Sequence, residues 1–316
     1  MSRLASIGEC MAEFRRGADG RFDLAYGGDT FNTAVYLCRL GVASDFVTLL
    51  GDDPFSDAIN ATCQSEGVGT GLIGRLPGRS AGLYVIETDS TGERTFHYWR
   101  DRSPVRDLFD HEFGGRVIAA LPSYDMIYLS GITLSLFSDR ALDVLFEGLD
   151  AARKSGAEVA FDGNFRAKGW PDRDRARAIF QQALKRTDIV LPTFDDDHVL
   201  FGDGKVSDTV ERYRDYGIRE VVIKDGKHCC TIATEGEVIQ VEAERVPRPV
   251  DTTAAGDSFN AGYLASRLTG NSPAEAALLG HQLASTVIQH PGAIIPKSIL
   301  EASGLRNALA SAGAIK

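Results

Sequence analysis

Short apolar runs alternate with helical patterns along most of the 316 residues, and this alternation limits the possible folds more than any other feature. Short apolar runs bounded by glycine or polar residues are typical of buried strands. Strands that alternate with helices favour an α/β fold, a doubly wound and mostly parallel sheet with helices on both faces. The predicted strands are residues 4–8, 46–50, 126–129, 159–162, 189–191 and 220–224.

Two segments interrupt this alternation. Residues 81–100 have two β-rich arms around a turn at residues 89–92, which predicts a hairpin. Residues 11–26 are short, polar and punctuated by glycine, so they do not predict another strand–helix unit. We expect the two segments to form a small β lid over one edge of the sheet. Because no Pro/Ser-rich linker divides the chain, we expect a single domain over residues 1–316 with this lid inserted.

The charge balance excludes some partners. The chain has 34 Lys and Arg against 44 Asp and Glu, a net charge of −10. This excess opposes non-specific binding to nucleic acid or anionic lipid, and it requires locally placed cations for any anionic substrate. The longest stretch without charged residues, 276–296, contains His281, Gln289 and Pro291. We therefore expect a buried helix followed by a turn there, and neither a membrane nor a nucleic-acid partner.

The start of the chain and its cysteines indicate a reducing compartment. Residues 1–14 lack an apolar core that ends in a small-residue cleavage site, so we expect no secretory signal and a cytoplasmic location. The five cysteines are odd in number and show no C-x-x-C spacing. This pattern predicts neither a disulfide framework nor a zinc site.

The stretch from Asp251 to Tyr263, DTTAAGDSFNAGY, is the most informative for chemistry. The small residues Ala254, Ala255 and Gly256 allow close approach of a ligand, and a helix beginning near Ala255 would direct unpaired N–H groups at an anion. Asp257, in the first turn, could then accept a proton from a hydroxyl nucleophile. The alternative is an ordinary helix start with small residues for packing. The chain has neither G-x-x-x-x-G-K-S/T nor a helix-opening G-x-G-x-x-G.

This stretch resembles the carboxyl-side signature of the ribokinase-like (PfkB-type) carbohydrate kinases. A looser amino-side signature is present as Gly27-Gly28, Asn32, Ala34, Gly41 and Gly51, with Thr30 as a departure. Within the family, the chain is most similar to kinases of 2-keto-3-deoxygluconate, in residues 7–11, 27–30, 83–84, 87–95, 98–100 and 251–257. The resemblance implies transfer of the ATP γ-phosphoryl group, with Mg²⁺, to the terminal hydroxyl of that sugar acid.

The resemblance also implies residue roles. Asp257 would be the catalytic base, assisted by the backbone at Ala254, Ala255 and Gly256. An arginine fork suits the carboxylate of a sugar acid, and Tyr, Asn and Asp suit its hydroxyls. The implied sugar-acid contacts are Gly28, Asp29, Asn32, Tyr84, Tyr98, Arg100, Arg166 and Asp257.

Each of these side chains also has a simpler interpretation. Tyr84 and Tyr98 could pack across strands, and Arg100 could end a solvated hairpin. Arg166 could form a surface ion pair with Asp172 or Asp174.

For ATP, the resemblance implies phosphate contacts from Asn164, Lys224, Gly226 and residues 254–256, and a purine site near His281, Ala284 and Gln289. The turn at the end of a strand would explain Gly226 equally well. Apolar helix packing is the alternative explanation for the segment of the predicted purine site. Many family members carry Asn-x-x-Glu near the metal, but here residues 193–196 read Thr-Phe-Asp-Asp. Asp195, Asp196 and Asp197 are the candidate acids, and no metal ligand is assigned.

Three other functions stay open. The chain could phosphorylate 2-keto-3-deoxygalactonate or fructose, or be a catalytically silent nucleotide-binding protein on the same fold. Lids of this kind often pair across a two-fold axis in related kinases, and an exposed hairpin edge gives a reason to pair. We therefore expect a homo-oligomer, a dimer or higher.

Overall fold

A computed structural model describes residues 2–17, 19–88 and 94–314, so the predicted turn at residues 89–92 lies outside the described residues. In the described chain the larger sheet has nine strands in the order β13-β12-β11-β10-β9-β8-β1-β4-β5. These strands are β1 (Arg3–Ile7), β4 (Ala43–Leu50), β5 (Ile73–Arg75), β8 (Met126–Ser130), β9 (Glu158–Asp162), β10 (Ile189–Val190), β11 (Glu220–Asp225), β12 (Cys229–Ala233) and β13 (Val238–Glu242).

The sheet is parallel from β5 to β11, and antiparallel where β12 and β13 extend its far edge. Every predicted strand is present. The sequence did not predict β5, β12 or β13. Strand β5 has only three residues, and the side chains of the edge strand β13 alternate between exposed and half-buried, so these two lack the continuous apolar run that identifies a strand buried on both faces.

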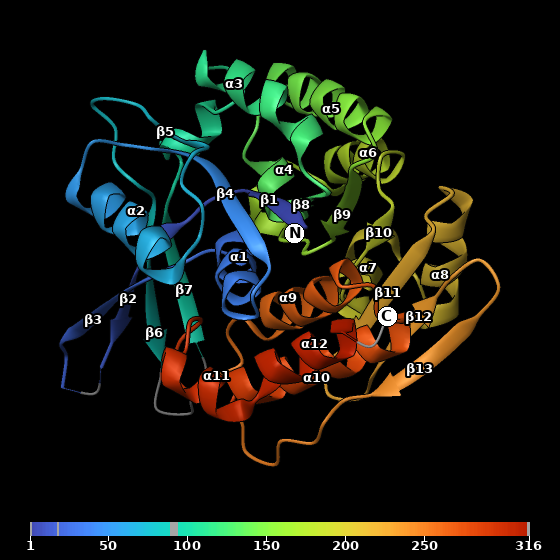
Figure 1. The fold of residues 1–316 in the computed structure, drawn as a ribbon. Helices are drawn as coiled ribbons and strands as arrows, with labels where there is room; N and C mark the ends of the chain where they lie inside the picture. The colour runs from blue at the N-terminus through green and yellow to red at the C-terminus, as the bar shows by residue number, and fades with distance from the viewer. Residues whose placement is uncertain (1, 18, 89–93, 315–316) are drawn as a thin grey trace.

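Helices cover both faces of the sheet (Figure 1). Neighbouring strand residues face opposite sides: Ala5 belongs to the core that includes residues of α3 to α8, whereas Leu4 belongs to the core that includes residues of α1 and α9 to α12. The helices are α1 (Asp29–Arg39), α2 (Pro54–Glu66), α3 (Phe113–Ala120), α4 (Gly131–Ser135), α5 (Asp139–Lys154), α6 (Arg173–Leu184), α7 (Phe194–Phe201), α8 (Val206–Asp215), α9 (Ala255–Leu268), α10 (Pro273–Val287), α11 (Lys297–Ser303) and α12 (Leu305–Ala314). The predicted doubly wound α/β fold is confirmed.

A second sheet, which we call the lid, projects from one side of the molecule (Figure 1). Its strand order is β3-β2-β6-β7, with β2 (Met11–Arg16), β3 (Phe22–Gly27), β6 (Leu83–Thr88) and β7 (Arg94–Trp99). The polar segment at residues 11–26 therefore forms two strands that pair with the predicted hairpin. Tyr84 and Tyr98 are directly opposite each other on β6 and β7, on the same face of the lid as Glu13.

The uncharged stretch at 276–296 forms most of α10 and the turn after it, as predicted. Across the described ranges, no helix is both long and apolar enough to cross a membrane.

Candidate active site

The candidate site lies where the parallel strands end and two helices begin. The parallel arrangement places the carboxyl ends of β1, β8, β9 and β11 at one edge of the sheet, the usual location of ligands in open α/β folds. The first turns of α1 and α9 meet at this edge, where the Asn32 amide donates a 2.8 Å hydrogen bond to Asp257.

Helix α9 begins at the predicted anion site. The residue before it, Ala254, has a left-handed backbone with φ of 61°, and no side chain of the described structure caps the helix. The two non-glycine residues with positive φ in the described chain, Ala254 and Asn164, both belong to the predicted site. Such backbone strain persists where the surrounding structure holds it in place, and it is common at functional sites.

Asp257, the predicted general base, lies in the first turn of α9. Burial and the nearby Asp29 carboxylate raise its pKa to about 7, although the hydrogen bond from Asn32 opposes this shift. Burial likewise raises the pKa of Asp29, which accepts a 2.8 Å hydrogen bond from the Asn164 amide. The fold thus brings together Asp29 and Asn164, which the sequence analysis assigned to different ligands.

Lys224 lies at the end of β11 with its ammonium group in the core of the site. Its Nζ donates to Asp162 Oδ1 at 3.3 Å and to Asn260 Oδ1 at 2.9 Å. The same nitrogen lies 3.7 Å from where a Cβ on Gly256 would be, so it adjoins the start of α9. Asn260 lies one turn after Asp257 on the same helix, and no role was predicted for it.

The lid residues are held by buried carboxylates. The hydroxyl of Tyr84 donates to Glu13, and the rings of Tyr84 and Tyr98 are 5.7 Å apart, so the predicted cross-strand packing is present. Arg100 pairs with Glu9, which is only 3% exposed, so it is not a solvated hairpin end. Glu9 and Glu13 were not predicted as site residues. Glu9 precedes β2 and Glu13 lies within it, and this nearness to the lid was the one feature of the sequence that could have indicated them.

Gly28 is required by a close backbone approach. A Cβ on this residue would lie 2.0 Å from the carbonyl oxygen of Glu9. The glycine thus lets the segment after β1 pass against the start of α1. This packing role accounts for Gly28 without a ligand.

Arg166 forms an ion pair, but the predicted partners are wrong. Its Nη1 lies 2.9 Å from Asp196. Asp172 instead caps α6 by accepting from the Arg175 amide, and Asp174 pairs with Arg177. Both aspartates are in the first turn region of α6, where carboxylates stabilise the helix dipole.

Comparison with known proteins identifies the family. The model of the pfkB family carbohydrate kinases matches residues 1–300. The chain belongs to the pfkB family of carbohydrate kinases. The resemblance inferred from the two signatures is therefore confirmed.

Several relatives of this pfkB-family chain are similar over nearly its whole length. A protein of Escherichia coli (strain K12) named 2-dehydro-3-deoxygluconokinase is 42% identical over 308 residues, covering 95% of this chain and 99% of the relative. The crystal structure of 2-dehydro-3-deoxygluconokinase from Thermotoga maritima has a TM-score of 0.82 at 22% identity, covering 96% of this chain and 100% of that one. A candidate ribokinase II from E. coli, solved in complex with ATP and Mg²⁺, has a TM-score of 0.82 at 20% identity. The match covers 98% of this chain and 99% of that one. Both structures share the fold of this chain.

The acids of the pfkB-family chain suit a magnesium ion that arrives with phosphates. The described residues contain no group of three or more His, Cys, Asp or Glu arranged to hold a metal. Mg²⁺ usually needs only one or two carboxylates together with phosphate oxygens and water. Asp196 is half-buried beside the site and fits this need, whereas Asp195 is exposed and Asp197 is fully buried against Arg212 at 2.8 Å.

The predicted purine residues lie along α10 and the turn after it. His281 packs edge-on against Phe259, its Nε2 lies 3.1 Å from the Val241 carbonyl oxygen, and burial lowers its pKa. Ala284 packs against the same core, and Gln289 donates to the Ser285 carbonyl. Helix packing thus accounts for these contacts, and a purine contact at this segment stays a prediction. Gly226 has φ of 53° in the turn after β11, so the turn at the end of the strand explains it.

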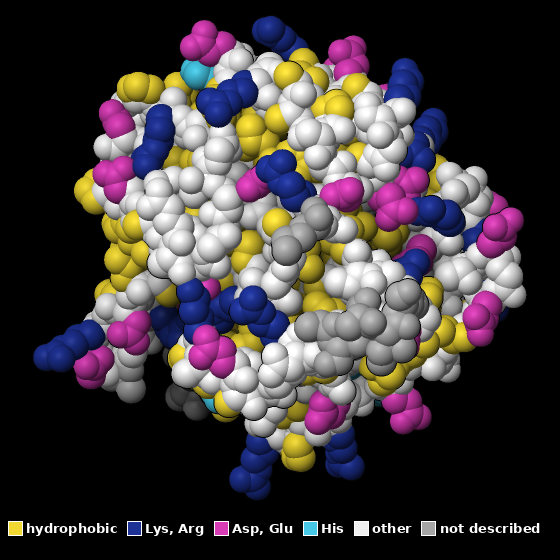
Figure 2. All heavy atoms as spheres, viewed as in Figure 1, with side chains coloured by type: hydrophobic (Ala, Val, Ile, Leu, Met, Phe, Trp, Pro, Cys, Tyr) yellow, Lys and Arg dark blue, Asp and Glu magenta, His cyan; other side chains and the backbone are white. Residues whose placement is uncertain are grey.

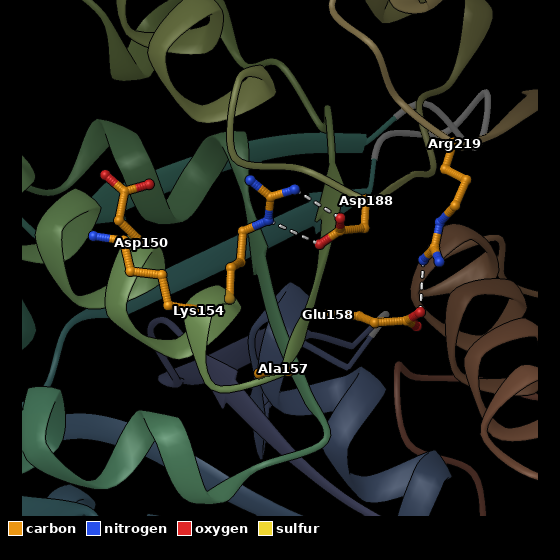
Figure 3. A pocket seen from close by; sticks show the side chains of 8 residues that line it. Asp150, Lys154, Ala157, Glu158, Asp188 and Arg219 are labelled. Carbon is orange, nitrogen blue, oxygen red and sulfur yellow. Dashed lines mark hydrogen bonds and ion pairs between the residues drawn. The ribbon is translucent and has the colours of Figure 1, made fainter.

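A surface hollow of about 600 Å³ lies at the opposite edge of the sheet, near the amino ends of β9, β10 and β11. Ion pairs join its walls. Arg153 lies 2.8 Å from Asp188, and Arg219 lies 2.6 Å from Glu158, the pair labelled in Figure 3. Asp188 also accepts from the Val159 amide, so its charge is used to tie strand ends together. These residues stabilise the sheet and belong to no part of the site.

Proposed function

We propose that the chain is an ATP-dependent kinase of 2-keto-3-deoxygluconate (2-dehydro-3-deoxygluconate). It would transfer the γ-phosphoryl group to the terminal hydroxyl, giving the 6-phospho sugar acid and ADP. The observation that carries the reaction is Asp257, a base in the first turn of an uncapped helix with Lys224 beside that helix start. The 42% identity to the E. coli relative supports the choice of sugar acid.

The chain's own residues account for the chemistry. Asp257 takes the proton from the attacking hydroxyl, a role worth about 10²–10⁴ in rate. Amides at the start of α9 and the Lys224 ammonium stabilise negative charge on the transferring group. Mg²⁺, held by the phosphates and Asp196, would neutralise part of the triphosphate charge. The lid would cover the sugar acid and exclude water.

The sugar acid is held by groups on and below the lid. Arg100 and Arg166 each pair with one carboxylate, and a guanidinium has five donors, so further N–H groups remain for the substrate carboxylate. Tyr84 already donates its proton to Glu13, and its oxygen can therefore accept a hydrogen bond from a substrate hydroxyl. Asp29 and Asn32 lie beside Asp257 and suit the hydroxyls near the reacting end.

The test is phosphorylation of 2-keto-3-deoxygluconate by the wild type and Asp257→Asn, with coupled detection of ADP. The wild type should release ADP only when sugar acid is present, and the variant should lose at least about 10²-fold in turnover. Near wild-type turnover by a folded variant would remove Asp257 as the base. A wild type that releases no ADP with any sugar would support the silent nucleotide-binding protein.

The acceptor is tested on a panel of 2-keto-3-deoxygluconate, 2-keto-3-deoxygalactonate and fructose. A carboxylate clamp predicts that Arg166→Ala reduces turnover on the sugar acids much more than any turnover on fructose. Faster wild-type turnover on fructose than on either sugar acid would replace our proposal by a fructokinase.

We also propose that the protein is a homodimer, or a higher oligomer, that pairs through its lids. Pairing of strands puts Phe22, Leu24 and Trp99 on the lid face opposite Tyr84, and all three are about half exposed or more. Sedimentation of the wild type and Leu24→Lys would test this, since a monomeric wild type contradicts it. The free cysteines and the use of ATP support a cytoplasmic location.

A further inference from the structure

Asn260 is a fully buried polar residue that the mechanism above does not use. Its Nδ2 donates to Asp162 Oδ2 at 2.7 Å and to Tyr128 Oη at 3.0 Å, while its Oδ1 accepts from Lys224 at 2.9 Å. The opposite orientation of the amide would place its NH₂ against the ammonium and its oxygen against the carboxylate. The surroundings thus fix one orientation, in which the carbonyl oxygen faces Lys224.

The Lys224 ammonium has three hydrogens to donate. Asp162 and Asn260 are the two acceptors that the described part of the chain provides. The side chain is only 10% exposed, so bulk water has little access to the remaining N–H group. Because Nζ lies 3.7 Å from a Cβ position on Gly256, that remaining donor adjoins the residue before Asp257.

We propose, on the basis of the kinase function above, that the third N–H of Lys224 binds the γ-phosphoryl group of ATP and that Asn260 is the positioning residue that holds it there. Asp257 takes the proton of the attacking hydroxyl, so the phosphoryl group nearest to it is the one transferred. The α- and β-phosphates lie farther along the nucleotide from that hydroxyl. Lys224 therefore distinguishes ATP from ADP, which lacks the γ-phosphoryl group.

The experiment is calorimetric titration of ATP and of ADP, each with Mg²⁺ and without sugar acid, into the wild type and Asn260→Leu. The wild type should bind ATP more tightly than ADP. Leucine has a similar volume, but Asn260→Leu removes the hydrogen bond to the Lys224 ammonium. The affinity for ATP should therefore fall about tenfold or more, as expected for the loss of a hydrogen bond to a charged group. The variant's affinity for ADP should stay within about threefold, whereas a purely structural role would weaken both nucleotides equally.

Tyr263→Phe is the matched control. It removes a buried tyrosine hydroxyl from the same helix, where that hydroxyl bonds Glu220 at 2.7 Å on the side away from the site. Both nucleotide affinities should stay at their wild-type values. A selective loss of ATP binding in this control would contradict the assignment to Asn260.

Tyr128→Phe covers the case in which Asn260→Leu does not fold. It keeps Asn260 and Lys224 but removes the oxygen that accepts one hydrogen of the Asn260 amide. The affinity for ATP should fall by about threefold, and the affinity for ADP should not change. Equal loss of both nucleotides, no loss of either, or a wild type without preference for ATP would overturn the inference and leave the kinase proposal standing. A wild type that binds no ATP would instead overturn the kinase function itself.

Discussion

At the scale of single residues, buried carboxylates dominate the candidate site. Asp29 and Asp257 lie near each other, and Glu9 and Glu13 support the lid, each with a cationic or hydroxyl partner. Carboxylates buried close together raise one another's pKa because like charges repel in a medium of low dielectric. The site is thus arranged to make an aspartate basic enough to accept a proton near neutral pH.

The first prediction concerns pH. The ionised form of Asp257 is the active one, so kcat/KM should fall tenfold per pH unit as the pH drops below about 7. Asn32→Leu removes a hydrogen bond to the ionised form, which should raise the pKa of Asp257. The acidic limb of the pH profile, in which kcat/KM falls, should therefore move to higher pH. The profiles of both proteins between pH 5.5 and 9 are the measurement. A limb that stays in place or moves to lower pH in the variant would contradict the role of Asn32.

The second prediction concerns Arg100 and stability. Arg100→Met leaves Glu9 buried without its partner, which should lower the free energy of unfolding by about 3–5 kcal/mol. Adding Glu9→Gln should recover part of the loss. The exposed pair of Arg16 and Glu87 is the control, because Arg16→Met should cost less than about 1 kcal/mol. Urea unfolding measures all of these variants, and equal losses at the two sites would refute the buried pairing.

At the scale of elements, helix α9 connects the core to the chemistry. Its far end is fixed to the sheet because Arg267 and Tyr263 both bond Glu220 at the start of β11. Its first turn meets α1 through Asn32 and Asp257. The open start of the helix therefore has a fixed direction relative to both the sheet and α1.

The third prediction concerns the start of α9. A left-handed backbone costs a non-glycine residue roughly 1–2 kcal/mol, and glycine avoids that cost at some loss of entropy. Ala254→Gly should therefore leave the free energy of unfolding unchanged or raise it by up to about 1 kcal/mol. Ala261→Gly, in the interior of the same helix, should lower it by about 1 kcal/mol or more. Clear destabilisation by Ala254→Gly in urea unfolding would contradict this.

At the scale of the whole molecule, the chain carries an excess of ten acidic charges. Acidic and basic side chains are interspersed on the face in Figure 2, without one large basic area. The cations of the site are themselves paired, Arg100 with Glu9, Arg166 with Asp196 and Lys224 with Asp162. Long-range attraction therefore contributes little to the binding of an anionic sugar acid, and short-range hydrogen bonds with fixed geometry decide it.

The fourth prediction follows from this charge. With Mg²⁺-ATP saturating, kcat/KM for the sugar acid should rise, on the order of twofold, as salt increases from 20 to 200 mM, because salt screens the repulsion between like charges. The measurement is kcat/KM for the sugar acid at several salt concentrations, with ADP detected directly. A steep fall would indicate electrostatic steering by a basic surface that we do not expect.

Much of the site could be predicted from the sequence because its residues lie in local patterns. Apolar runs marked the parallel strands, since a strand buried on both faces needs apolar residues throughout. Small residues followed by Asp257 indicated a candidate anion site, since a helix start needs only one local segment. The edge strand β13 and the partner of Arg166 gave no such pattern, because an exposed strand and an ion pair between distant segments depend on what packs beside them.

The sequence by itself determined the alternation of strands and helices and the family, and it indicated Asp257 as the candidate base, because each depends on residues near one another in the chain. Only the tertiary structure decided which charges meet. Asn260 faces Lys224, Glu9 faces Arg100 and Asp197 faces Arg212 because segments far apart in the chain are packed together. A buried charge must find a partner wherever the fold brings one, and no local pattern of residues specifies where that is.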